Sequence, residues 1–516
     1  MTIKGLIKKG EYFDSVSLMI VSQNLNKVEG VLDSSVVMGT HENKAILKTA
    51  DLFVPEFEKS SDTDLLIAIK AENEDLANNA IMKVDELLKN IRKKDDSSSE
   101  FAPKSISGAV KQMPEANLVL ISIAGKYAAK EARESLEKGI NVMMFSDNVS
   151  ISDELELKQL AHSKGLLMMG PDCGTAIINQ IPLAFANVVS RGNIGIVAAS
   201  GTGLQEVSCI ISNGGAGISQ AIGTGGRDVK KDIGGIMFID ALRALNQDDE
   251  TKIIVLVSKP PHEDVLKKIA DEIAKIKKPV VGIFIGGNPE VIRKAGAIPA
   301  NNLEEAALIA TFLSKNQNLE NVYQSIEKRN AEIKETAKKI STKVKGKYLR
   351  GLFSGGTLCD ESQLILKSYI GDCYGNSPLN AEMVLKDVWK SEKHTIIDLG
   401  EDEFTAGRPH PMIDYSLRCK RIIQEAKDPE TAIILLDVVL GYGSHLNPDK
   451  ELVPVIAEAK KINPDLPIIC SITGTDGDPQ NRRQVKQNLE NAGAIVMQSN
   501  VAATILCGEI LKYKII

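Results

Sequence analysis

The sequence is poor in aromatic residues and contains no long apolar run. Aromatic side chains make up 4% of its 516 residues and include a single tryptophan, so stacking platforms for nucleic-acid bases are not expected. No stretch reaches the roughly 18 to 20 apolar residues that a membrane-spanning helix needs. The first residues, MTIKGLIKKGEYFD, lack the apolar segment of a signal peptide. These absences predict a cytoplasmic protein that binds neither nucleic acid nor a membrane.

Paired cysteines and an excess of charge are also missing. The seven cysteines are scattered and form no CxxC pair, so we expect reduced thiols and no metal site. Charged residues are 25% of the chain, and the formal net charge is only -6. This balance does not mark a protein that binds polyanions.

What the chain does contain is a long alternation of strand and helix patterns. A chain of 516 residues is too long for one hydrophobic core and implies roughly three or four domains. Residues 1–95 have the pattern of a small α/β unit, and the polar stretch KKDDSSSE at 93–100 is typical of a linker. In the rest of the chain, apolar strands between helices predict Rossmann-like or flavodoxin-like parallel sheets. The predicted segments are 101–190, 191–315, 316–347 (a helical connector) and 348–516.

One stretch, NIGIVAASGTGLQEVSCIIS at 193–212, joins an apolar strand, a Gly-rich turn and the start of a helix. The turn consists of Ser200, Gly201, Thr202 and Gly203. Free N–H groups and the positive end of the helix dipole point out of such a turn, which suits a phosphate or a carboxylate. The alternative is that the small residues serve only the packing of the strand against the helix.

A second copy of this pattern, RGLFSGGTLCDE, occupies residues 350–361. Its turn consists of Ser354, Gly355, Gly356 and Thr357. Internal repetition of this kind predicts two related lobes, each of which offers one helix N-terminus. The aligned positions of the two copies are Ser200, Gly201, Leu204 and Glu206 with Ser354, Gly355, Leu358 and Asp360.

Further polar groups follow predicted strands, where open α/β sheets bind ligands. Asp172 and Cys173 follow the strand at 166–169, and Asn288 follows another strand and two glycines, so we place all three in a substrate or cofactor pocket. Cys173 is either a nucleophile or a small buried thiol. Asp437 is a carboxylate inside the long apolar strand 432–440, and carboxylates at strand ends orient cations or act as bases.

Two arginines and a histidine are candidates for contact with a substrate. Arg227 follows a Gly-rich stretch that includes Gly225, and its planar fork can hold an anion. The alternative is a solvated arginine in a mobile loop. Arg408 and His410 lie together in the proline-containing segment GRPHP, which predicts a rigid loop that contacts the substrate.

Residues 193–261 resemble the α-subunit of succinyl-CoA synthetase. The matching features are the GIV..SGT strand and turn, the GxGG loop and FIDAL at 238–242. MMGPDCG at 168–174 is similar to the GPNCPG element that ends the CoA-binding domain of that family. Residues 345–510 resemble the carboxyl-terminal lobe of its β-subunit, with IDLG at 397–400 in the place of an LDVGG element. The whole chain resembles the FdrA proteins, in which these lobes are fused.

The resemblance implies a CoA-binding-like domain at 101–190 and two facing turns. In the synthetases, one helix N-terminus from each lobe holds a phosphohistidine, and the turns at 200 and 354 take those places. This chain departs from the pattern because Lys294 stands where the family's GHAGA element has its histidine. The glutamate that partners that histidine falls near Ser258 and Lys259, where there is no acid. An ATP-grasp domain and the Gly-rich CoA motif are not evident either.

The resemblance to FdrA implies one subunit of a multi-subunit oxamate carbamoyltransferase, which interconverts oxalurate plus phosphate with oxamate plus carbamoyl phosphate. Phosphate or carbamoyl phosphate would lie at the two turns, and Arg227, Arg408 or His410 would polarise the carbonyl or bind the substrate carboxylate. One alternative is an acyl-CoA synthetase subunit that binds CoA. Another is a non-catalytic metabolite-binding or scaffold subunit. The expected partners are small carboxylate and phosphate metabolites and other protein subunits.

Overall fold

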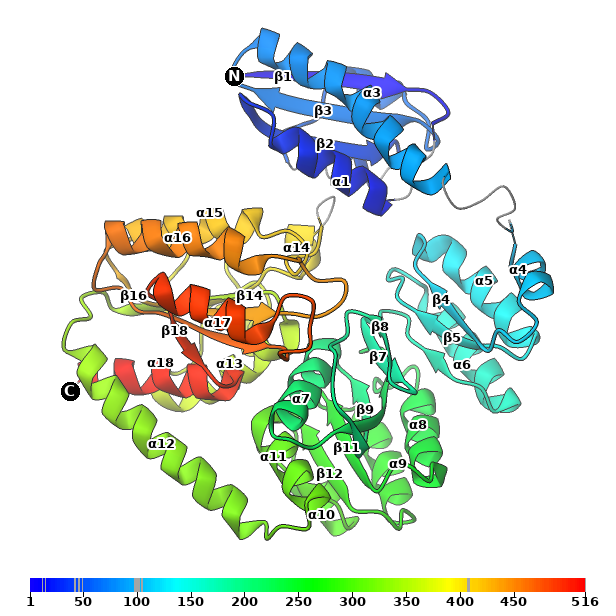
Figure 1. Ribbon diagram of the computed structural model, residues 1–516, viewed down its shortest axis with the longest axis vertical. Coiled ribbons are helices and arrows are strands. Elements are labelled where there is room, and N and C mark those ends of the chain that lie inside the picture. Colours follow the sequence, from blue (N-terminus) through cyan, green and yellow to red (C-terminus); the bar gives the residue numbers. More distant parts are fainter. Residues whose placement is uncertain are drawn as a thin grey trace. The chain divides into compact units, whose positions relative to one another are not determined.

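Figure 1 shows the computed structural model of the chain. It describes residues 1–515 apart from positions 12, 14, 41–42, 45–46, 49, 97–102, 104 and 406–408. Internal packing divides the chain into two units. One unit holds residues 1–114 together with 401–410, and the other holds residues 115–400 and 411–516.

The amino-terminal unit is built on a small antiparallel sheet with strand order β1-β3-β2. Apolar residues of α1 and α3 pack on one face of this sheet (Figure 1), and a second apolar cluster around Phe57 covers the other face. This matches the small α/β unit expected from the sequence. The elements are β1 (Thr2–Lys8), α1 (Ser15–Asn26), β2 (Val31–Met38), η1 (Pro55–Lys59), β3 (Leu65–Ala71), α3 (Glu74–Asp96), α4 (Ile106–Gln112) and α14 (Asp402–Thr405).

The second unit starts with a three-stranded parallel sheet of order β4-β5-β6. Its helices α5 and α6 bury alanine and leucine side chains against the strands, since those residues recur on one face of each helix. The elements are β4 (Leu118–Ile121), α5 (Gly125–Glu137), β5 (Asn141–Met144), α6 (Ile151–Lys164) and β6 (Met168–Met169).

A seven-stranded sheet of order β13-β12-β11-β9-β10-β7-β8 follows and forms lobe 1. Its central strands are parallel and buried along their length, so they read as continuous apolar runs in the sequence. The strands are β7 (Thr175–Ile178), β8 (Ile181–Ala184), β9 (Arg191–Ala199), β10 (Ile218–Gly223), β11 (Ile253–Ser258), β12 (Val280–Phe284) and β13 (Ile298–Pro299). The helices are α7 (Gly201–Asn213), α8 (Ile236–Gln247), α9 (Glu263–Ile273), α10 (Pro289–Lys294) and α11 (Leu303–Ser314).

Helix α12 (Glu320–Ser341) leads to lobe 2, a parallel sheet of order β15-β14-β16-β17-β18. This order repeats the order β10-β9-β11-β12-β13 of lobe 1, so the internal repeat in the sequence corresponds to a repeated fold. The strands are β14 (Tyr348–Phe353), β15 (Thr395–Asp398), β16 (Thr431–Val439), β17 (Ile468–Thr473) and β18 (Ile495–Met497). The helices are α13 (Gly356–Ile370), η2 (Ala381–Met383), α15 (Ser416–Lys427), α16 (Pro448–Ile462), α17 (Arg482–Asn491) and α18 (Asn500–Ile515).

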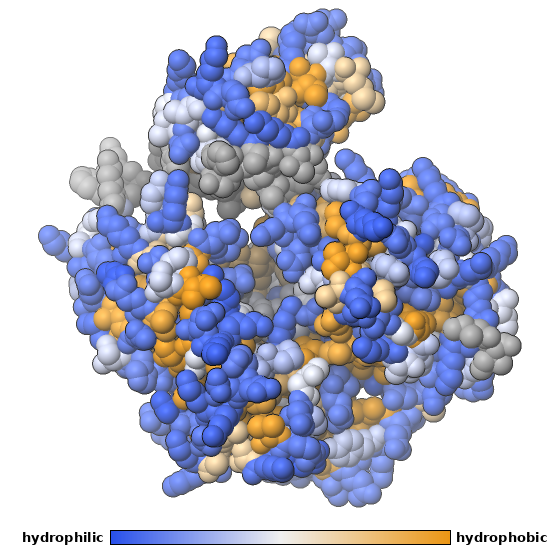
Figure 2. All heavy atoms as spheres, turned by 180° about the vertical axis from the view of Figure 1, so that it is seen from behind, coloured by the Kyte–Doolittle hydropathy of each residue, from blue (hydrophilic) through white to orange (hydrophobic). Residues whose placement is uncertain are grey.

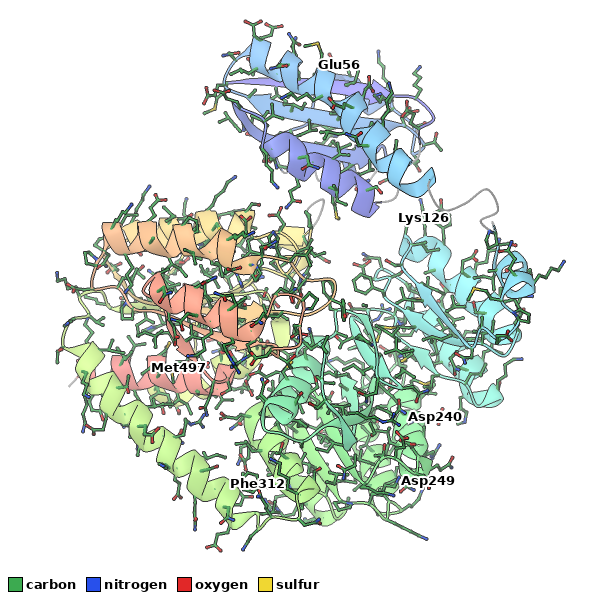
Figure 3. All side chains as sticks on the ribbon, viewed as in Figure 1. Glu56, Lys126, Asp240, Asp249, Phe312 and Met497 are labelled. Carbon is green, nitrogen blue, oxygen red and sulfur yellow. The ribbon has the colours of Figure 1, made fainter. Side chains whose placement is uncertain are left out.

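The two lobes share one hydrophobic core. A continuous cluster of buried side chains runs from β9 and α7 of lobe 1 to β14, α13 and α18 of lobe 2. Phe312 on α11 and Met497 on β18, both labelled in Figure 3, pack against this core from the two lobes. The expected fold class, several parallel-sheet α/β domains and a small amino-terminal α/β unit, is confirmed.

The hairpin β7–β8 was not expected from the sequence. It is antiparallel and belongs to the sheet of lobe 1, whereas the sequence placed residues 101–190 in the preceding domain. Its two-residue turn, Asn179–Gln180, has φ angles of 49° and 70°, which is the backbone of a type I′ turn. The usual Asn-Gly signal for that turn is missing here, because glutamine stands at the second position.

The surface carries no long apolar helix. Over the described part of the chain, no helix combines the length and apolarity that crossing a membrane requires. The face seen in Figure 2 is largely hydrophilic, with apolar side chains in scattered patches.

Candidate functional site

Each Gly-rich turn joins a strand of its lobe, β9 or β14, to a helix, α7 or α13. Each of these helices contacts the other lobe at its start. Ser200 is the N-cap of α7, in an extended conformation, and its Oγ accepts a hydrogen bond of 3.1 Å from Gly203 N. Gly355 is the N-cap of α13, also extended, and has no side chain with which to cap it. The strand, turn and helix expected at 193–212 and 350–361 are therefore present.

The two turns meet across the boundary between the lobes. Ser200 Oγ lies 2.6 Å from Thr357 Oγ1. A Cβ atom on Gly355 would lie 3.1 Å from Oγ1 of Thr202, so the backbone of lobe 2 approaches lobe 1 closely at this glycine. Both predicted anion-binding turns thus lie at one junction, which the sequence alone could not decide.

The contacts at this junction are reciprocal. The turn residue Ser200 contacts Thr357 on α13, and the corresponding Gly355 lies against Thr202 on α7. Deeper in the interface, Glu206 accepts a hydrogen bond from Asn500 N at the start of α18. Glu361 in turn accepts one from Leu303 N at the start of α11. Each lobe therefore caps a helix of the other lobe with a carboxylate.

This reciprocity corrects the alignment of the two copies by one residue. Glu206 and Glu361 are each the sixth residue of their helix, and they make matching contacts. The partner of Glu206 is therefore Glu361, whereas the sequence pattern paired it with Asp360. The shift arises because the N-cap of α7 is the serine of its Ser-Gly pair, Ser200, whereas the N-cap of α13 is the glycine, Gly355. Helix α13 therefore begins one residue later than an alignment of the two Ser-Gly pairs suggests.

The turn of lobe 2 is already filled by a carboxylate. Asp437 Oδ1 accepts hydrogen bonds from Ser354 N (2.8 Å) and Ser354 Oγ (3.0 Å), and Oδ2 accepts one from Gly355 N (2.8 Å). Arg418 NH1 lies 2.7 Å from Oδ1, and both charged side chains are fully buried. The predicted phosphate site at Ser354 and Gly355 is thus occupied by the protein's own aspartate, because those donors are used.

The equivalent strand position in lobe 1 carries no acid. Asp437 follows Leu436, which pairs with Leu352, three residues before the N-cap of α13. In lobe 1, Val197 lies three residues before the N-cap of α7 and pairs with Leu256, so the residue that corresponds to Asp437 is the buried Val257. The amides of Gly201 and Thr202 form no hydrogen bond to any described residue, and neither do those of Gly356 and Thr357. The first two amides of each helix are therefore free at the junction.

Lys259 brings a positive charge to the same junction. Its Nζ lies 2.6 Å from Asp360 Oδ2 on α13. Partial burial lowers the pKa of Lys259, but the neighbouring carboxylates of Asp360 and Asp398 outweigh that effect and raise it. The lysine is therefore charged, and its pairing with Asp360 links the end of β11 to α13.

A carboxylate also stands beside the start of α13. Asp398 accepts a hydrogen bond of 2.9 Å from Gly400 N, and its Oδ2 lies 2.6 Å from where a Cβ of Gly356 would be. A negative charge at this end of α13 is stabilised by the helix dipole. The same charge disfavours a second anion there, so the lobe 2 side of the junction is the less suitable binding side.

Arg227 lies in a buried ion cluster that joins lobe 1 to α6. Its Nε is 2.8 Å from Glu154, which also pairs with Lys158 at 2.8 Å. Lys158 in addition contacts Asp228, whose carboxylate accepts hydrogen bonds from the first amides of α8. The structure therefore ties Arg227 to Glu154, and its predicted contact with a substrate stays a prediction.

The structure gives the surroundings of the predicted pocket residues, whose shared pocket stays a prediction. Cys173 is buried, and burial raises the pKa of its thiol to about 12, so the packing interpretation fits it better than the nucleophile. A Cβ on Gly225 would lie 2.3 Å from the backbone oxygen of Pro171, the residue before Asp172. Asn288 is exposed and caps the short helix α10 through Glu290 N.

Four of the histidines that the structure describes in the second unit have partners away from the two turns. His162, His262, His394 and His445 make their hydrogen bonds elsewhere, with Asp240 or with backbone amides. Lys294, which stands where the synthetases have histidine, is exposed at the end of α10. His410 belongs to the amino-terminal unit, and Arg408 lies outside the described residues, so their predicted roles stay predictions.

Sequence reasoning missed two contacting groups, Arg418 and Lys259, and it singled out Asp437 without its contact with the turn. Asp437 did give a signal, since a lone carboxylate within nine buried strand residues needs a partner. Arg418 and Lys259 gave none, because their partners lie on elements far away in the sequence.

Models of three known families match separate parts of the chain. A model of the CoA-ligase family matches residues 352–510, which are lobe 2. A model of the CoA-binding domain matches residues 189–286 in lobe 1, and a model named AllF, heavy metal-associated domain, matches residues 1–103. The sequence analysis had placed its CoA-binding-like domain earlier, at 101–190.

The chain is also similar to individual proteins. The uncharacterized protein YahF of Escherichia coli (strain K12) is 45% identical over 521 residues, which cover 99% of each chain. The succinate–CoA ligase [ADP-forming] subunit alpha 2 of Archaeoglobus fulgidus is 28% identical over 187 residues, 35% of this chain and 63% of that protein. The apo structure of the dinucleotide forming acetyl-coenzyme A synthetase 1 of Ca. Korarchaeum cryptofilum has a TM-score of 0.35 at 14% identity and covers 80% of this chain and 85% of that one.

The metal that the name of the amino-terminal family suggests does not fit this chain. Residues 1–103 contain no cysteine, and soft heavy metals select thiolate ligands. Among the residues that the structure describes, no group of His, Cys, Asp and Glu side chains is arranged to hold a metal ion. We therefore derive no metal chemistry for this unit.

Proposed function

The chain belongs to the family of the Escherichia coli protein YahF, and from that premise we propose that it is a subunit of an acid–CoA ligase-type enzyme. In this proposal, phosphate or an acyl phosphate binds at the junction of α7 and α13. The lobes on which the proposal rests are succinyl-CoA synthetase-like, as the CoA-binding and CoA-ligase matches establish. The observation that carries it is the contact between Ser200 and Thr357, which brings the two helix N-termini together.

The junction suits a phosphate that is bound without a covalent bond to the protein. In such a reaction, a phosphate oxygen attacks the carbonyl carbon of a CoA thioester, the C–O bond forms as the C–S bond breaks, and the proton of phosphate goes to the departing thiolate. The amides of Gly201 and Thr202 would orient the phosphate, and Lys259 would neutralise charge. A phosphohistidine plays no part in this scheme, in keeping with the exposed Lys294.

Residues near the start of α5 fit the nucleotide end of CoA. Lys126 and Tyr127 are both exposed, and Lys126 Nζ lies 5.1 Å from the centre of the Tyr127 ring. They follow β4 at the carboxyl edge of a parallel sheet, which is where such sheets bind ligands. Lys126, labelled in Figure 3, would contact a phosphate of CoA, and Tyr127 would stack on the base.

The test is to incubate the purified chain with succinyl-CoA or acetyl-CoA and to measure release of the free thiol with and without phosphate. The proposal expects release that depends on phosphate, and CoA binding that weakens at least about tenfold in Lys126→Glu. Lys130→Glu, a charge change on the same helix further from the strand end, is the control. CoA that binds neither the wild type nor any variant would contradict the proposal.

Carbamoyl transfer to phosphate is the second candidate, and the contact between Ser200 and Thr357, which brings the two helix N-termini together, suits it as well. Attack of phosphate on the carbamoyl group of oxalurate needs the same positioned phosphate and needs neither ATP nor CoA. The FdrA family name, the hetero-oligomeric partners and the roles of Arg408 and His410 belong to this candidate. Adding oxalurate and phosphate in place of the thioester distinguishes the two, since only carbamoyl transfer would form oxamate and carbamoyl phosphate.

A further inference from the structure

We propose that a cavity between helix α11, helix α12 and the end of strand β18 is a binding site for a small zwitterion, a free α-amino acid with an apolar side chain. The volume of this cavity is about 280 Å³, and its lining combines side chains of both charges with two apolar ones. None of the lining residues belongs to the two Gly-rich turns. The proposal therefore does not depend on the function proposed for their junction.

The base of the cavity is a buried ion pair between the two lobes' connecting elements. Glu304 on α11 is 3% exposed, and its Oε2 lies 2.5 Å from Nη1 of Arg329 on α12. Its Oε1 accepts hydrogen bonds from Gln498 Nε2 (3.1 Å) and Ser499 Oγ (2.9 Å), which follow Met497, labelled in Figure 3. Both oxygens of Glu304 therefore have partners, and this glutamate holds together the three elements that surround the cavity.

Arg329 keeps a donor for a ligand. Its Nε donates to Asn330 Oδ1 at 2.9 Å and its Nη1 donates to Glu304, whereas its Nη2 forms no hydrogen bond with any residue that the structure describes. A guanidinium is well suited to bind a carboxylate, because its planar N–H groups match the two carboxylate oxygens. The carboxylate of a ligand is therefore expected next to Arg329.

The rim of the cavity carries one further charge of each sign. Lys328 and Glu332 are exposed, lie four positions apart on α12, and form no ion pair with each other or with any other described residue. Together with Glu304 and Arg329 they make a lining with no net charge. A zwitterion leaves this balance unchanged, whereas a ligand of one charge would disturb it. Its carboxylate would contact Arg329 and Lys328, and its ammonium group would contact Glu332.

The size and the apolar part of the lining restrict the ligand further. Leu308 on α11 and Ile326 on α12 are the two apolar lining residues, and both pack against the shared core. Ligand pockets usually have volumes of about 300 to 1,000 Å³, so a cavity of about 280 Å³ takes only a small molecule. An α-amino acid with an apolar side chain meets all three conditions of size, charge and apolar contact.

The first experiment titrates the full chain by calorimetry with glycine, L-alanine, L-valine and L-leucine, one at a time. We expect L-valine to bind more tightly than glycine, because its side chain contacts the apolar lining. Two analogues of L-valine test the charges: 3-methylbutanoate lacks the ammonium group, and 2-methylpropylamine lacks the carboxylate. Each should bind at least about tenfold more weakly than L-valine. If none of the four amino acids bound, or if 3-methylbutanoate bound as tightly as L-valine, the proposal would be overturned.

The second experiment closes the cavity from its rim. Ser325 lines the cavity and is exposed on α12, so Ser325→Trp places an indole there without disturbing buried packing and should abolish binding of L-valine. Gln324→Trp, at the exposed neighbouring position outside the lining, is the matched control. Glu332→Gln removes the partner of the ammonium group and should weaken binding about fivefold, whereas the exposed change Glu327→Gln on the same helix should not.

The variants show whether binding occurs in this cavity. Unchanged binding of L-valine to Ser325→Trp would place the ligand elsewhere and overturn the proposal. An equal loss in Ser325→Trp and Gln324→Trp would overturn it too, because the second substitution does not reach the cavity. Binding to Glu332→Gln as tight as that of the wild type would contradict the contact between the ammonium group and Glu332. The melting temperature of each variant without ligand shows that it is folded.

Discussion

The two lobes share a strand order and a strand–turn–helix, yet they use the same turn in different ways. In lobe 2 the turn at Ser354 is filled by Asp437, and a buried arginine fixes that aspartate. In lobe 1 the strand beside the turn at Ser200 has no carboxylate, because the corresponding residue is Val257. A duplicated scaffold can therefore keep one copy of an anion-binding turn as a permanent structural element. What differs is a single strand residue, Asp437 or Val257, and its partners.

The largest effect should come from removing the aspartate of lobe 2. Asp437→Ala leaves Arg418 buried without its partner and should lower the free energy of unfolding by about 3–5 kcal/mol. Ser258→Ala, at the end of β11 in lobe 1, removes one hydrogen bond and should cost about 1 kcal/mol. Urea unfolding of both variants measures the contrast. Equal losses would mean that the pair of Asp437 and Arg418 does not stabilise lobe 2.

The glutamates that link the lobes should make stability depend on pH. Burial raises the pKa of Glu361 to about 8, although hydrogen bonds from Asn500 and Leu303 N lower it in part. The folded chain then holds a proton that the unfolded chain loses near pH 4.5. The free energy of unfolding therefore falls as pH rises from about 4.5 to about 8, by roughly 1–4 kcal/mol.

Glu361→Gln cannot titrate and should flatten this dependence. The measurement is urea unfolding at pH 5.5 and pH 8 for the wild type and the variant. Glu327→Gln, an exposed change on α12, is the control and should keep the slope of the wild type. A Glu361→Gln slope as steep as that of the wild type would show that other groups cause the pH dependence.

Moving the carboxylate from one lobe to the other tests the comparison through binding. Val257→Asp places an acid at the position that Asp437 holds in lobe 2, where it would face the Ser200 turn. The affinity for phosphate should then fall at least tenfold, a loss of about 1.4 kcal/mol or more. Val257→Asn introduces the same shape without the charge and should retain more of the affinity. Equal affinities of the two variants would exclude charge as the cause.

Most of the fold could be predicted from the sequence, because buried parallel strands and amphipathic helices leave strong patterns. The two Ser-Gly turns could also be found, since one repeats the other. The contact between the two turns could not be predicted, because it joins Ser200 and Thr357, which are 157 positions apart in the sequence. The roles of Arg418 and Lys259 could not be predicted either, because their partners Asp437 and Asp360 lie on other elements of the chain. The ion pair of Arg227 with Glu154 could not be predicted for the same reason, since the two residues belong to different predicted domains.

The smallest effect should come from the glycines themselves. A methyl group on Gly355 would lie 3.0 to 3.1 Å from Thr202, tighter than ordinary contact, so Gly355→Ala should cost about 1–2 kcal/mol as the lobes move apart. A methyl group on Gly201 would meet only Thr175 Oγ1 at 3.6 Å, so Gly201→Ala should be neutral or stabilise by about 0.5 kcal/mol, since alanine restricts the unfolded chain. Thermal unfolding of the two variants in parallel measures this difference. If Gly355→Ala were as stable as Gly201→Ala, the close approach of the lobes at Gly355 would be wrong.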